Sequence, residues 1–294
     1  MLFARRRLLL AATGLGGMLL ASLALAFIPA QPKTHPGTLE VTSIDVGEGD
    51  SILVVTPQGR TVLVDAGGPV WGAGTQLDFG EDVVAPYLWT RGISRLDAVA
   101  ISHGHSDHIG GMPAILKDFR PKELWISLQP PSRALENVIA EAHALGIKVV
   151  RHWEGDEFSM GGAKVDVLFP PQNWPVGLEP KNNDSTVLYM SYGATSVLLE
   201  GDAEKAVERR IASVHPVHAD LLKVGHHGSA TSTTPEILEA GSPHLRADLS
   251  RLSQSLRPAE SNCARSPASL RYPRVPDRPR RRCKLLPRRP LRHS

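Results

Sequence analysis

The sequence predicts an α/β fold in which two mixed β-sheets lie face to face between outer layers of helices. Three observations support this four-layered αββα sandwich. The body of the chain opens with short antiparallel strands, strands then alternate with helices, and a second succession of strands and helices follows. A chain of 294 residues with 41% hydrophobic residues is long enough to bury a large core of this kind.

Residues 1–30 are predicted to be a signal peptide or a single membrane anchor. Arg5–Arg7 precede an apolar run from Leu8 to Ile28, which is long enough for one membrane span. Ala24 and Ala26 have the spacing that signal peptidase favours. We therefore expect a membrane protein with an extracytoplasmic domain, or a periplasmic or secreted protein if the leader is cleaved.

The body at residues 38–240 follows a Pro-rich linker at residues 31–37. Three apolar, β-branched stretches between Gly-containing turns predict an opening meander with strands at Thr38–Ile44, Ser51–Thr56 and Thr61–Asp65. Helical periodicity and buried runs then alternate. They predict a helix at Glu81–Thr90, a strand at Leu96–Ser102, a helix starting within Gly111–Lys117, a strand at Glu123–Ile126, a helix at Ser132–Leu145 and a strand at Lys148–Val150.

The second half of the body repeats this succession. Gly-punctuated strands are predicted near Phe158 and at Ala163–Phe169, followed by a hairpin of Thr186–Tyr192 and Thr195–Glu200. A helix at Ala203–Ser213 and a strand at Asp220–Val224 complete the pattern. Two such halves predict the two sheets.

Charge and cysteine usage separate the body from the tail at residues 241–294. The tail carries 14 Lys and Arg against 3 Asp and Glu, which leaves 19 against 27 for residues 1–240, so the body is acidic. Both cysteines, Cys263 and Cys283, lie in the tail. A metal in the body must therefore be held by histidine and carboxylate.

The strongest motif is the histidine-rich stretch after the strand predicted at Leu96–Ser102. His103, His105, Asp107 and His108 crowd six positions in the pattern H-x-H-x-D-H. A loop can direct alternate side chains to two sites, so we expect His103 and His105 at one metal and Asp107 and His108 at a second. The alternative interpretation of this stretch is a solvated polar loop that binds no metal.

Strand ends further along the chain offer the residues that would complete two metal sites. Asp202 follows a Gly turn and is expected to bridge the two cations, although Gly-Asp alone is usually a turn or a helix cap. Side chains alternate along an extended segment, so His226 is assigned to the second metal and His227 to substrate contact or leaving-group protonation, with the reverse left open. Asp65 is expected to orient a ligand imidazole, or to be a turn aspartate. Asp107 and His227 are the predicted catalytic residues.

With these residues identified, the chain resembles the metallo-beta-lactamase superfamily, and within it the C-terminal domain of ComEC-type DNA-internalisation competence proteins. The likeness covers about residues 38–240 and rests on several strings in order. These strings are Ile44–Ser51, Asp65–Gly68, Pro86–Leu88, Arg91–Ile93, Leu96–Asp97, His103–Gly111, Asn182–Leu188, Gly201–Asp202 and Val224–Ser229.

Two departures from the family pattern concern the site. Glu48 stands where the competence family usually has Gln, and Asn182–Ser185 stands where many superfamily enzymes have a third histidine. Asn183 and Ser185 are expected to lie beside the ligands, and water or substrate is expected to complete the first metal site. The competence relatives resemble multi-span channels, so the resemblance also implies a channel component on a separate chain.

The chemistry expected from this site is metal-assisted hydrolysis with two divalent metal ions. Histidine-rich ligation favours zinc, and the share of oxygen ligands leaves manganese open. The first functional prediction is an extracytoplasmic phosphodiesterase or nuclease acting on DNA, although the acidic body offers no obvious basic stripe. The alternatives are a hydrolase of a small ester, lactone or phosphodiester, and a non-catalytic or inactive truncated copy.

The Arg- and Pro-rich tail is interpreted as the product of a shifted reading frame, which would leave the sandwich without its last strands. In the other frame, codons for Arg274–Pro290 can encode RVYRTDRDGAVSFYLDG, and those for Asp248–Ala259 can encode ISVGSANPYGQP. Both resemble the ending expected from the family. The hypothesis places a frameshift between about Ala240 and Leu245, and a DNA sequence that keeps one frame through this stretch would refute it.

Overall fold

The computed structural model describes residues 2–27, 32–69, 77–242, 245–247 and 283–285. The first sheet has the strand order β13-β1-β2-β3-β4-β5-β6. Its N-terminal strands form an antiparallel meander, and β3 to β6 run parallel. The strands are β1 (Leu39–Ser43), β2 (Ile52–Val55), β3 (Thr61–Val64), β4 (Ala98–Ala100), β5 (Glu123–Ile126), β6 (Lys148–Arg151) and β13 (Cys283–Leu285).

The second sheet has the strand order β12-β11-β10-β9-β8-β7. Strands β7 to β10 are antiparallel neighbours, whereas β10, β11 and β12 pair in parallel. The strands are β7 (Glu157–Met160), β8 (Ala163–Phe169), β9 (Val187–Tyr192), β10 (Thr195–Leu199), β11 (Leu221–Lys223) and β12 (Leu245–Ala247). Each sheet therefore combines an antiparallel part with a parallel part, as the sequence predicts.

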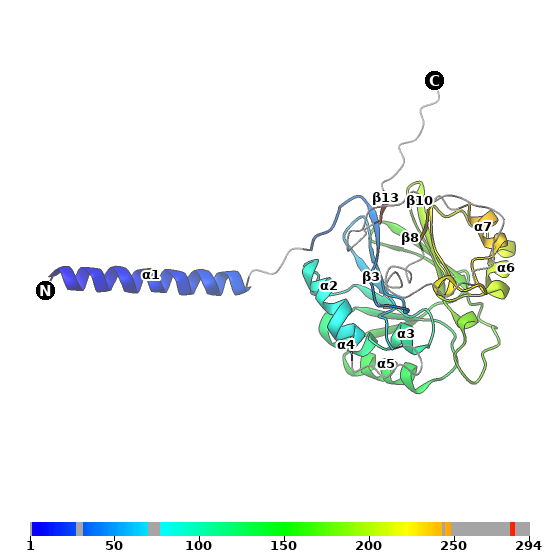
Figure 1. The fold of residues 1–294 in the computed structure, drawn as a ribbon, viewed down its shortest axis with the longest axis horizontal. Coiled ribbons are helices and arrows are strands. Elements are labelled where there is room, and N and C mark those ends of the chain that lie inside the picture. Colours follow the sequence, from blue (N-terminus) through cyan, green and yellow to red (C-terminus); the bar gives the residue numbers. More distant parts are fainter. Residues whose placement is uncertain (1, 28–31, 70–76, 243–244, 248–282, 286–294) are drawn as a thin grey trace, which may run out of the picture.

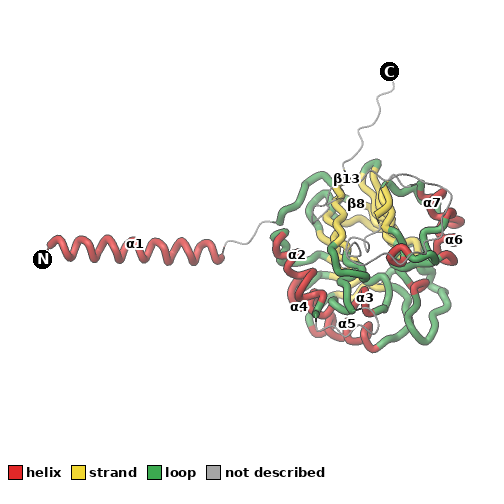
Figure 2. Tube along the Cα trace, in the orientation of Figure 1, coloured by secondary structure: helices red, strands yellow, loops and turns green. Residues whose placement is uncertain are grey.

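Helices cover the outer face of each sheet, which gives the four layers seen in Figures 1 and 2. The first sheet is covered by the π-helical turn η1 (Gly80–Val84) with α2 (Ala85–Thr90), and by α4 (Met112–Phe119) and α5 (Arg133–Ala144). The second sheet is covered by α6 (Lys205–Val214) and α7 (Pro235–Gly241). The predicted αββα sandwich is confirmed.

Alternation along the strands creates a separate core on each side of each sheet. In β2, Leu53 and Val55 pack with the helices of the first layer, while Ile52 and Val54 pack against the second sheet. All four side chains are buried, which explains why this strand is a continuous apolar run. Full burial of one such side chain contributes roughly 1.5–3 kcal/mol, so these cores hold the two sheets in a fixed relative position.

The N-terminal helix α1 (Leu2–Phe27) stands apart from the sandwich in Figure 1. Its described apolar side chains are exposed, with Leu15 at 73% and Met18 at 70%. Among the described residues, no helix combines the length and the hydropathy needed to cross a membrane.

The tail adds more structure than its composition indicates. β12 pairs in parallel with β11, and β13 pairs antiparallel with β1 through the register Leu39 to Leu285. Composition misses such strands because an open sheet edge pairs through main-chain groups and needs no apolar pattern in the added segment. The rest of the tail, including Asp248–Ala259, lies outside the described residues.

Restoring the reading frame after Ala240 is expected to raise the melting temperature by about 10 °C. The alternating part of the restored strand, AVSFYL, would begin at position 283, where β13 already pairs with β1. Two or three more buried side chains at roughly 1.5–3 kcal/mol each correspond to such a rise in a domain of this size. Thermal unfolding of the two forms, monitored by circular dichroism, checks this, and an unchanged melting temperature would count against the frame hypothesis.

Candidate metal centre

The predicted site residues meet where a parallel pair of strands from each sheet ends. In the first sheet β3 and β4 are parallel, and in the second sheet β10 and β11 are parallel. The loops after these four strands carry, in order, Asp65, the segment from Ser102 to His108, Asp202 and the segment from Gly225 to Gly228. The carboxyl ends of parallel strands share one edge of a sheet, so four loops distant in sequence converge.

His103 and His105 form a pair on the loop after β4. His103 Nε2 lies 2.9 Å from His105 Nδ1, and His105 Nε2 lies 3.0 Å from the carbonyl oxygen of Pro180. Donation of the Nε2 proton to this carbonyl leaves His105 Nδ1 with a free lone pair facing His103. The two ring nitrogens can therefore serve one metal together.

Asp107 and His108 follow on α3 (Ser106–Ile109), a single helical turn where the sequence indicates a polar loop. His108 is fully buried, and its Nδ1 donates to Asp65 Oδ2 at 2.8 Å. Asp65 Oδ1 also accepts from the backbone N–H of Ser102 at 2.8 Å. Asp65 thus fixes both the ring of His108 and the start of the histidine loop, and it leaves His108 Nε2 pointing into the site.

Asp202 enters the site from the turn after β10. Gly201 has a φ of +54°, and a Cβ there would lie 2.9 Å from Ser102 Cβ, so glycine allows this turn to approach the histidine loop. The backbone N–H of Asp202 donates to Ser185 Oγ at 3.0 Å. The carboxylate is then held with Oδ2 at 3.2 Å from both His108 Nε2 and His227 Nε2.

The structure places His227 at the centre and His226 at its rim, on the short 3-10 turn η3 (His226–Gly228). His227 Nε2 lies 3.5 Å from Asp107 Oδ2, whereas His226 Nδ1 lies 3.0 Å from Thr231 Oγ1 and 3.4 Å from Glu204 Oε1. This geometry favours the reverse assignment that the sequence left open, with His227 rather than His226 facing the candidate ligands of the second metal. Both histidines have positive φ, 43° and 51°, so strand alternation does not apply to them.

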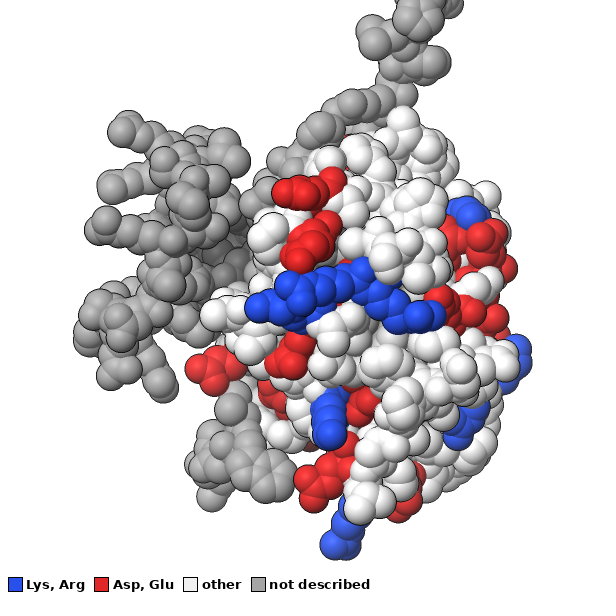
Figure 3. All heavy atoms as spheres, turned by 90° about the vertical axis from the view of Figure 1, so that its right-hand side faces the viewer, with Lys and Arg blue, Asp and Glu red and all other residues white. Residues whose placement is uncertain are grey.

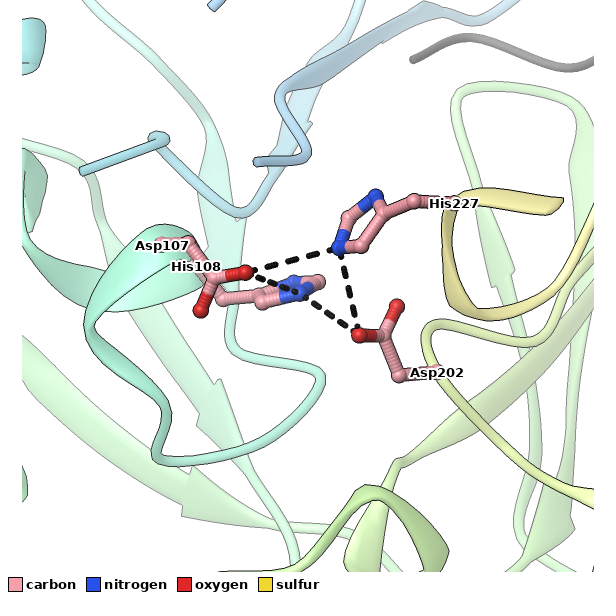
Figure 4. Close-up of side chains that lie close together, drawn as sticks. All are labelled: Asp107, His108, Asp202 and His227. Carbon is pink, nitrogen blue, oxygen red and sulfur yellow. Dashed lines mark ion pairs between the residues drawn. The ribbon is translucent and has the colours of Figure 1, made fainter. Parts of the chain in front are cut away.

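Four ligand atoms from Asp107, His108, Asp202 and His227 face one another in Figure 4. Asp202 Oδ2 lies 3.2 Å from both His108 Nε2 and His227 Nε2. Asp107 Oδ2 lies 3.5 Å from His227 Nε2 and 3.8 Å from His108 Nε2. Ligand atoms about 2.1 Å from a tetrahedral zinc lie about 3.4 Å from one another, and these four separations fall around that value. The side chains present therefore fit a divalent metal.

The first candidate site, at His103 and His105, adjoins the second. The rings of His103 and His108 have centroids 4.2 Å apart, so the two sites are neighbours. Among the residues that the structure describes, the nitrogens of two imidazoles face each other at the first site. This arrangement suits a site that water or substrate completes.

The charges at the centre shift its pKa values in opposite directions. Burial alone would lower the pKa of His108, but Asp202 and Asp65 raise it well above its usual value. Burial would likewise lower the pKa of His227, but Asp107 and Asp202 raise it to about 9. Burial would raise the pKa of Asp202, but His108 and Lys223 hold it well below its usual value. Without metal, the centre is therefore a network of imidazolium and carboxylate groups.

Metal binding is expected to release protons and to tighten as the pH rises toward about 9. His227, with a pKa of about 9, and His108 are protonated at neutral pH in the metal-free protein, and a metal binds only the neutral ring. Each protonated ligand weakens the apparent affinity about tenfold per pH unit below its pKa. Calorimetric titration with Zn²⁺ in buffers of different ionisation enthalpy measures the protons released, and an affinity independent of pH between 6 and 8 would contradict this expectation.

Asn183 and Ser185, which were also expected near the ligands, hold different parts of the Asp202 turn. Ser185 supports Asp202 as described, whereas Asn183 Oδ1 accepts from the backbone N–H of Glu204 at 2.9 Å and so holds the turn that follows Asp202. Sequence reasoning missed two buried neighbours of the centre, Asp50 and Lys223. Asp50 lies inside the Ile44–Ser51 string of the family resemblance, and Lys223 directly precedes the Val224–Ser229 string, which was the available signal.

The model of the metallo-beta-lactamase superfamily matches residues 44–245, which include every candidate ligand. The chain belongs to the metallo-beta-lactamase superfamily. Its fold and the motifs at Asp65, His103–His108 and Asp202 are those on which the resemblance rests.

Curated relatives of the chain include a protein of the ComE operon and a competence protein. The chain is 37% identical over 214 residues to ComE operon protein 3 of Bacillus subtilis (69% of this chain, 27% of the relative). It is 33% identical to Recombination protein 2 of Haemophilus influenzae (71% and 24%) and 31% identical to Competence protein ComA of Neisseria gonorrhoeae (80% and 31%). The resemblance to competence proteins is confirmed, and the alignments cover less than a third of each relative's length.

Solved structures with similar folds include other metallo-beta-lactamase proteins. One is YhfI from Bacillus subtilis, with 16% identity, a TM-score of 0.42 and coverage of 63% of this chain and 70% of that one. Another is a diphosphatase of the PhnP family, with 18% identity, a TM-score of 0.40 and coverage of 76% and 92%.

Proposed function

We propose that this protein is a two-metal phosphodiesterase that cleaves DNA outside the cytoplasmic membrane. The observation that carries the proposal is the convergence of His108, Asp202, His227 and Asp107 at metal-binding separations, beside the facing pair of His103 and His105. Two divalent cations in such a site supply Lewis-acid stabilisation of developing negative charge and activation of water. The similarity to competence proteins supports DNA as the substrate class.

The protein residues divide this task among them. His103 and His105 would hold one metal, while Asp107, His108 and His227 would hold the other. Asp202 Oδ2 faces His108 and His227 of the second set, and the Asp202 charge also acts on His103, so Asp202 would bridge the two. Zinc suits this ligand set, and the two carboxylates also admit manganese.

Polar side chains beside the centre offer contacts for a substrate. His226 lies within hydrogen-bonding distance of Thr231 Oγ1 at 3.0 Å and of Asn182 Nδ2 at 3.1 Å, and Asn182 also donates to Glu204 at 3.2 Å. His226 is partly exposed next to a ligand candidate. In the reversed assignment, His226 contacts the scissile group or its leaving oxygen.

Surface charge bears on the choice between a strand of DNA and a small substrate. On the face drawn in Figure 3, a band of Lys and Arg side chains runs between groups of Asp and Glu. On α6, Arg209 pairs with Glu236 at 2.8 Å and Arg210 pairs with Glu154 at 2.7 Å, so these two positive charges are partly neutralised. A phosphate-tracking groove would depend on unpaired cations, so short DNA is the better first substrate to test.

The deciding experiment measures metal content and hydrolysis by the full-length protein loaded with Zn²⁺ or Mn²⁺. Substrates are short single-stranded DNA oligonucleotides, bis(p-nitrophenyl) phosphate and a chromogenic carboxylic ester. His105→Ala tests the centre, and His143→Ala is its matched control because His143 is an exposed histidine on α5. We expect two metals per chain and cleavage of DNA that depends on His105 but not on His143.

Each contrary outcome points to a different function. Hydrolysis of the carboxylic ester alone would replace the nuclease with a small-molecule hydrolase. A purified chain that binds no metal would indicate a non-catalytic domain and would refute the proposal.

The location of the protein is part of the proposal. We infer that residues 1–30 direct the domain to the outer side of the cytoplasmic membrane, where a channel on a separate chain would be its partner. Cell fractionation combined with N-terminal sequencing checks this. Full-length protein confined to the cytosol would exclude it.

A further inference from the structure

A buried carboxylate outside the candidate ligand set faces the metal centre. Asp50 lies in the loop between β1 and β2, and its side chain is 2% exposed. Its neighbour Gly49 brings the loop against α3, because a Cβ there would lie 2.0 Å from the carbonyl oxygen of Asp107. Only a residue without a side chain allows this close approach, which carries Asp50 into the site.

Asp50 directs its two carboxylate oxygens to different partners. Oδ1 is 3.6 Å from His227 Nδ1, and Oδ2 is 2.5 Å from Lys223 Nζ. Among the described residues Asp50 Oδ1 makes no hydrogen bond, although it is fully shielded from solvent. A small rotation of the His227 ring would bring Nδ1 into hydrogen-bonding distance of this oxygen.

Lys223, the last residue of β11, fills the space between two carboxylates. Its ammonium group contacts Asp50 Oδ2, the carbonyl oxygen of Gly201 at 2.7 Å, and Asp202 Oδ1 at 3.5 Å. The contacts with Gly201 and Asp202 are hydrogen bonds, and the contact with Asp50 is an ion pair. Because Lys223 occupies the side of Oδ1, Asp202 presents only Oδ2 to His108 and His227.

We propose that Asp50 and Lys223 are a positioning pair for the metal centre, with Asp50 orienting the His227 ring through Nδ1 and Lys223 restricting Asp202 to a bridge through one oxygen. The inference rests on the proposed metal centre and assigns a role to the Gly-Asp of the Ile44–Ser51 string. Asp50 would serve His227 as Asp65 serves His108. Carboxylates of this kind raise metal affinity about 10–100-fold.

A buried ion pair can instead serve the fold alone, and the chain contains a matched example of that kind. Arg91 Nη2 lies 3.0 Å from Glu40 Oε1, and both side chains are 1% exposed. Neither residue contacts the metal-ligand candidates. Replacing each pair by apolar residues removes both buried charges at once, which avoids leaving one charge without a partner.

The test measures Zn²⁺ affinity of the full-length protein by competition with a chromophoric chelator. Asp50→Leu/Lys223→Met removes the pair, Asp50→Asn/Lys223→Met removes the charges but keeps an acceptor for His227, and Glu40→Leu/Arg91→Met is the control. We expect the first variant to bind Zn²⁺ about 10–100-fold more weakly than wild type, the second to recover part of this loss, and the control to match wild type. Melting of each metal-free form shows whether it folds.

Unchanged affinity in Asp50→Leu/Lys223→Met would overturn the inference, and so would an equal loss in the two Asp50 variants. If Asp50→Leu/Lys223→Met does not fold, Asp50→Asn/Lys223→Met tests the inference instead. Wild-type Zn²⁺ affinity in that variant would show that Lys223 has no positioning role. Failure of the wild-type protein to bind Zn²⁺ would refute the proposed function itself, which is a separate result.

Discussion

Replacing His227 by alanine is expected to remove metal from the centre and to lower hydrolysis roughly 10²–10³-fold. His227 Nε2 lies 3.2 Å from Asp202 Oδ2 and 3.5 Å from Asp107 Oδ2, so its loss leaves one corner of the tetrahedron empty. His226→Ala is the matched comparison from the adjacent position. It should keep the metal and mainly raise KM, because His226 lies among Asn182, Thr231 and Glu204.

Metal analysis by mass spectrometry and steady-state kinetics on both variants distinguish the two assignments. The opposite pattern, with metal lost from His226→Ala and retained by His227→Ala, would restore the first assignment made from the sequence. Loss of metal from both would show that His226 also supports the centre.

The sequence predicts the sandwich well because its strands and helices have clear periodicity. The four-residue run of β2 and the 12-residue helix α5 each bury the face that their pattern indicates. The convergence of Asp65, Asp202 and the His103–His108 loop also follows from the sequence, since each residue comes directly after a strand. Periodicity and position after a strand are local properties, and a single sequence contains them.

The features that sequence reasoning missed depend on contacts between distant segments. The turn α3 has only four residues, too few for any period to show. The exchange of His226 and His227 follows from two consecutive residues with positive φ, a conformation that their sequence does not indicate. Asp50 and Lys223 are ordinary charged residues until the fold brings them within 2.5 Å of each other. By contrast, α7 had a local signal, because Thr234 caps it by accepting from Ile237 and Pro235 occupies its first turn.

Asp202→Asn is expected to lower hydrolysis on the order of 10³-fold, because Asp202 is the proposed bridge between the two metal sites. The asparagine side chain has one oxygen, so it cannot both accept from Lys223 and bind a metal. With its oxygen toward Lys223, its NH₂ group faces His108 and His227 and cannot bind a metal. With its oxygen toward the metals, its NH₂ group meets the Lys223 ammonium, which lies 3.5 Å from Asp202 Oδ1.

A second readout separates this role from loss of the fold. Asp202 is one of the charges that raise the pKa of His108, so in Asp202→Asn the remaining metal binding should depend less steeply on pH. Asp220→Asn is the control, since Asp220 is also a buried carboxylate of the second sheet and accepts from the Ser196 N–H at 3.0 Å. Zn²⁺ titrations at pH 6, 7 and 8 measure the slope. An Asp202→Asn protein that keeps two metals and wild-type turnover would show that Asp202 is not the bridge, and the two sites would then have to be joined by another group.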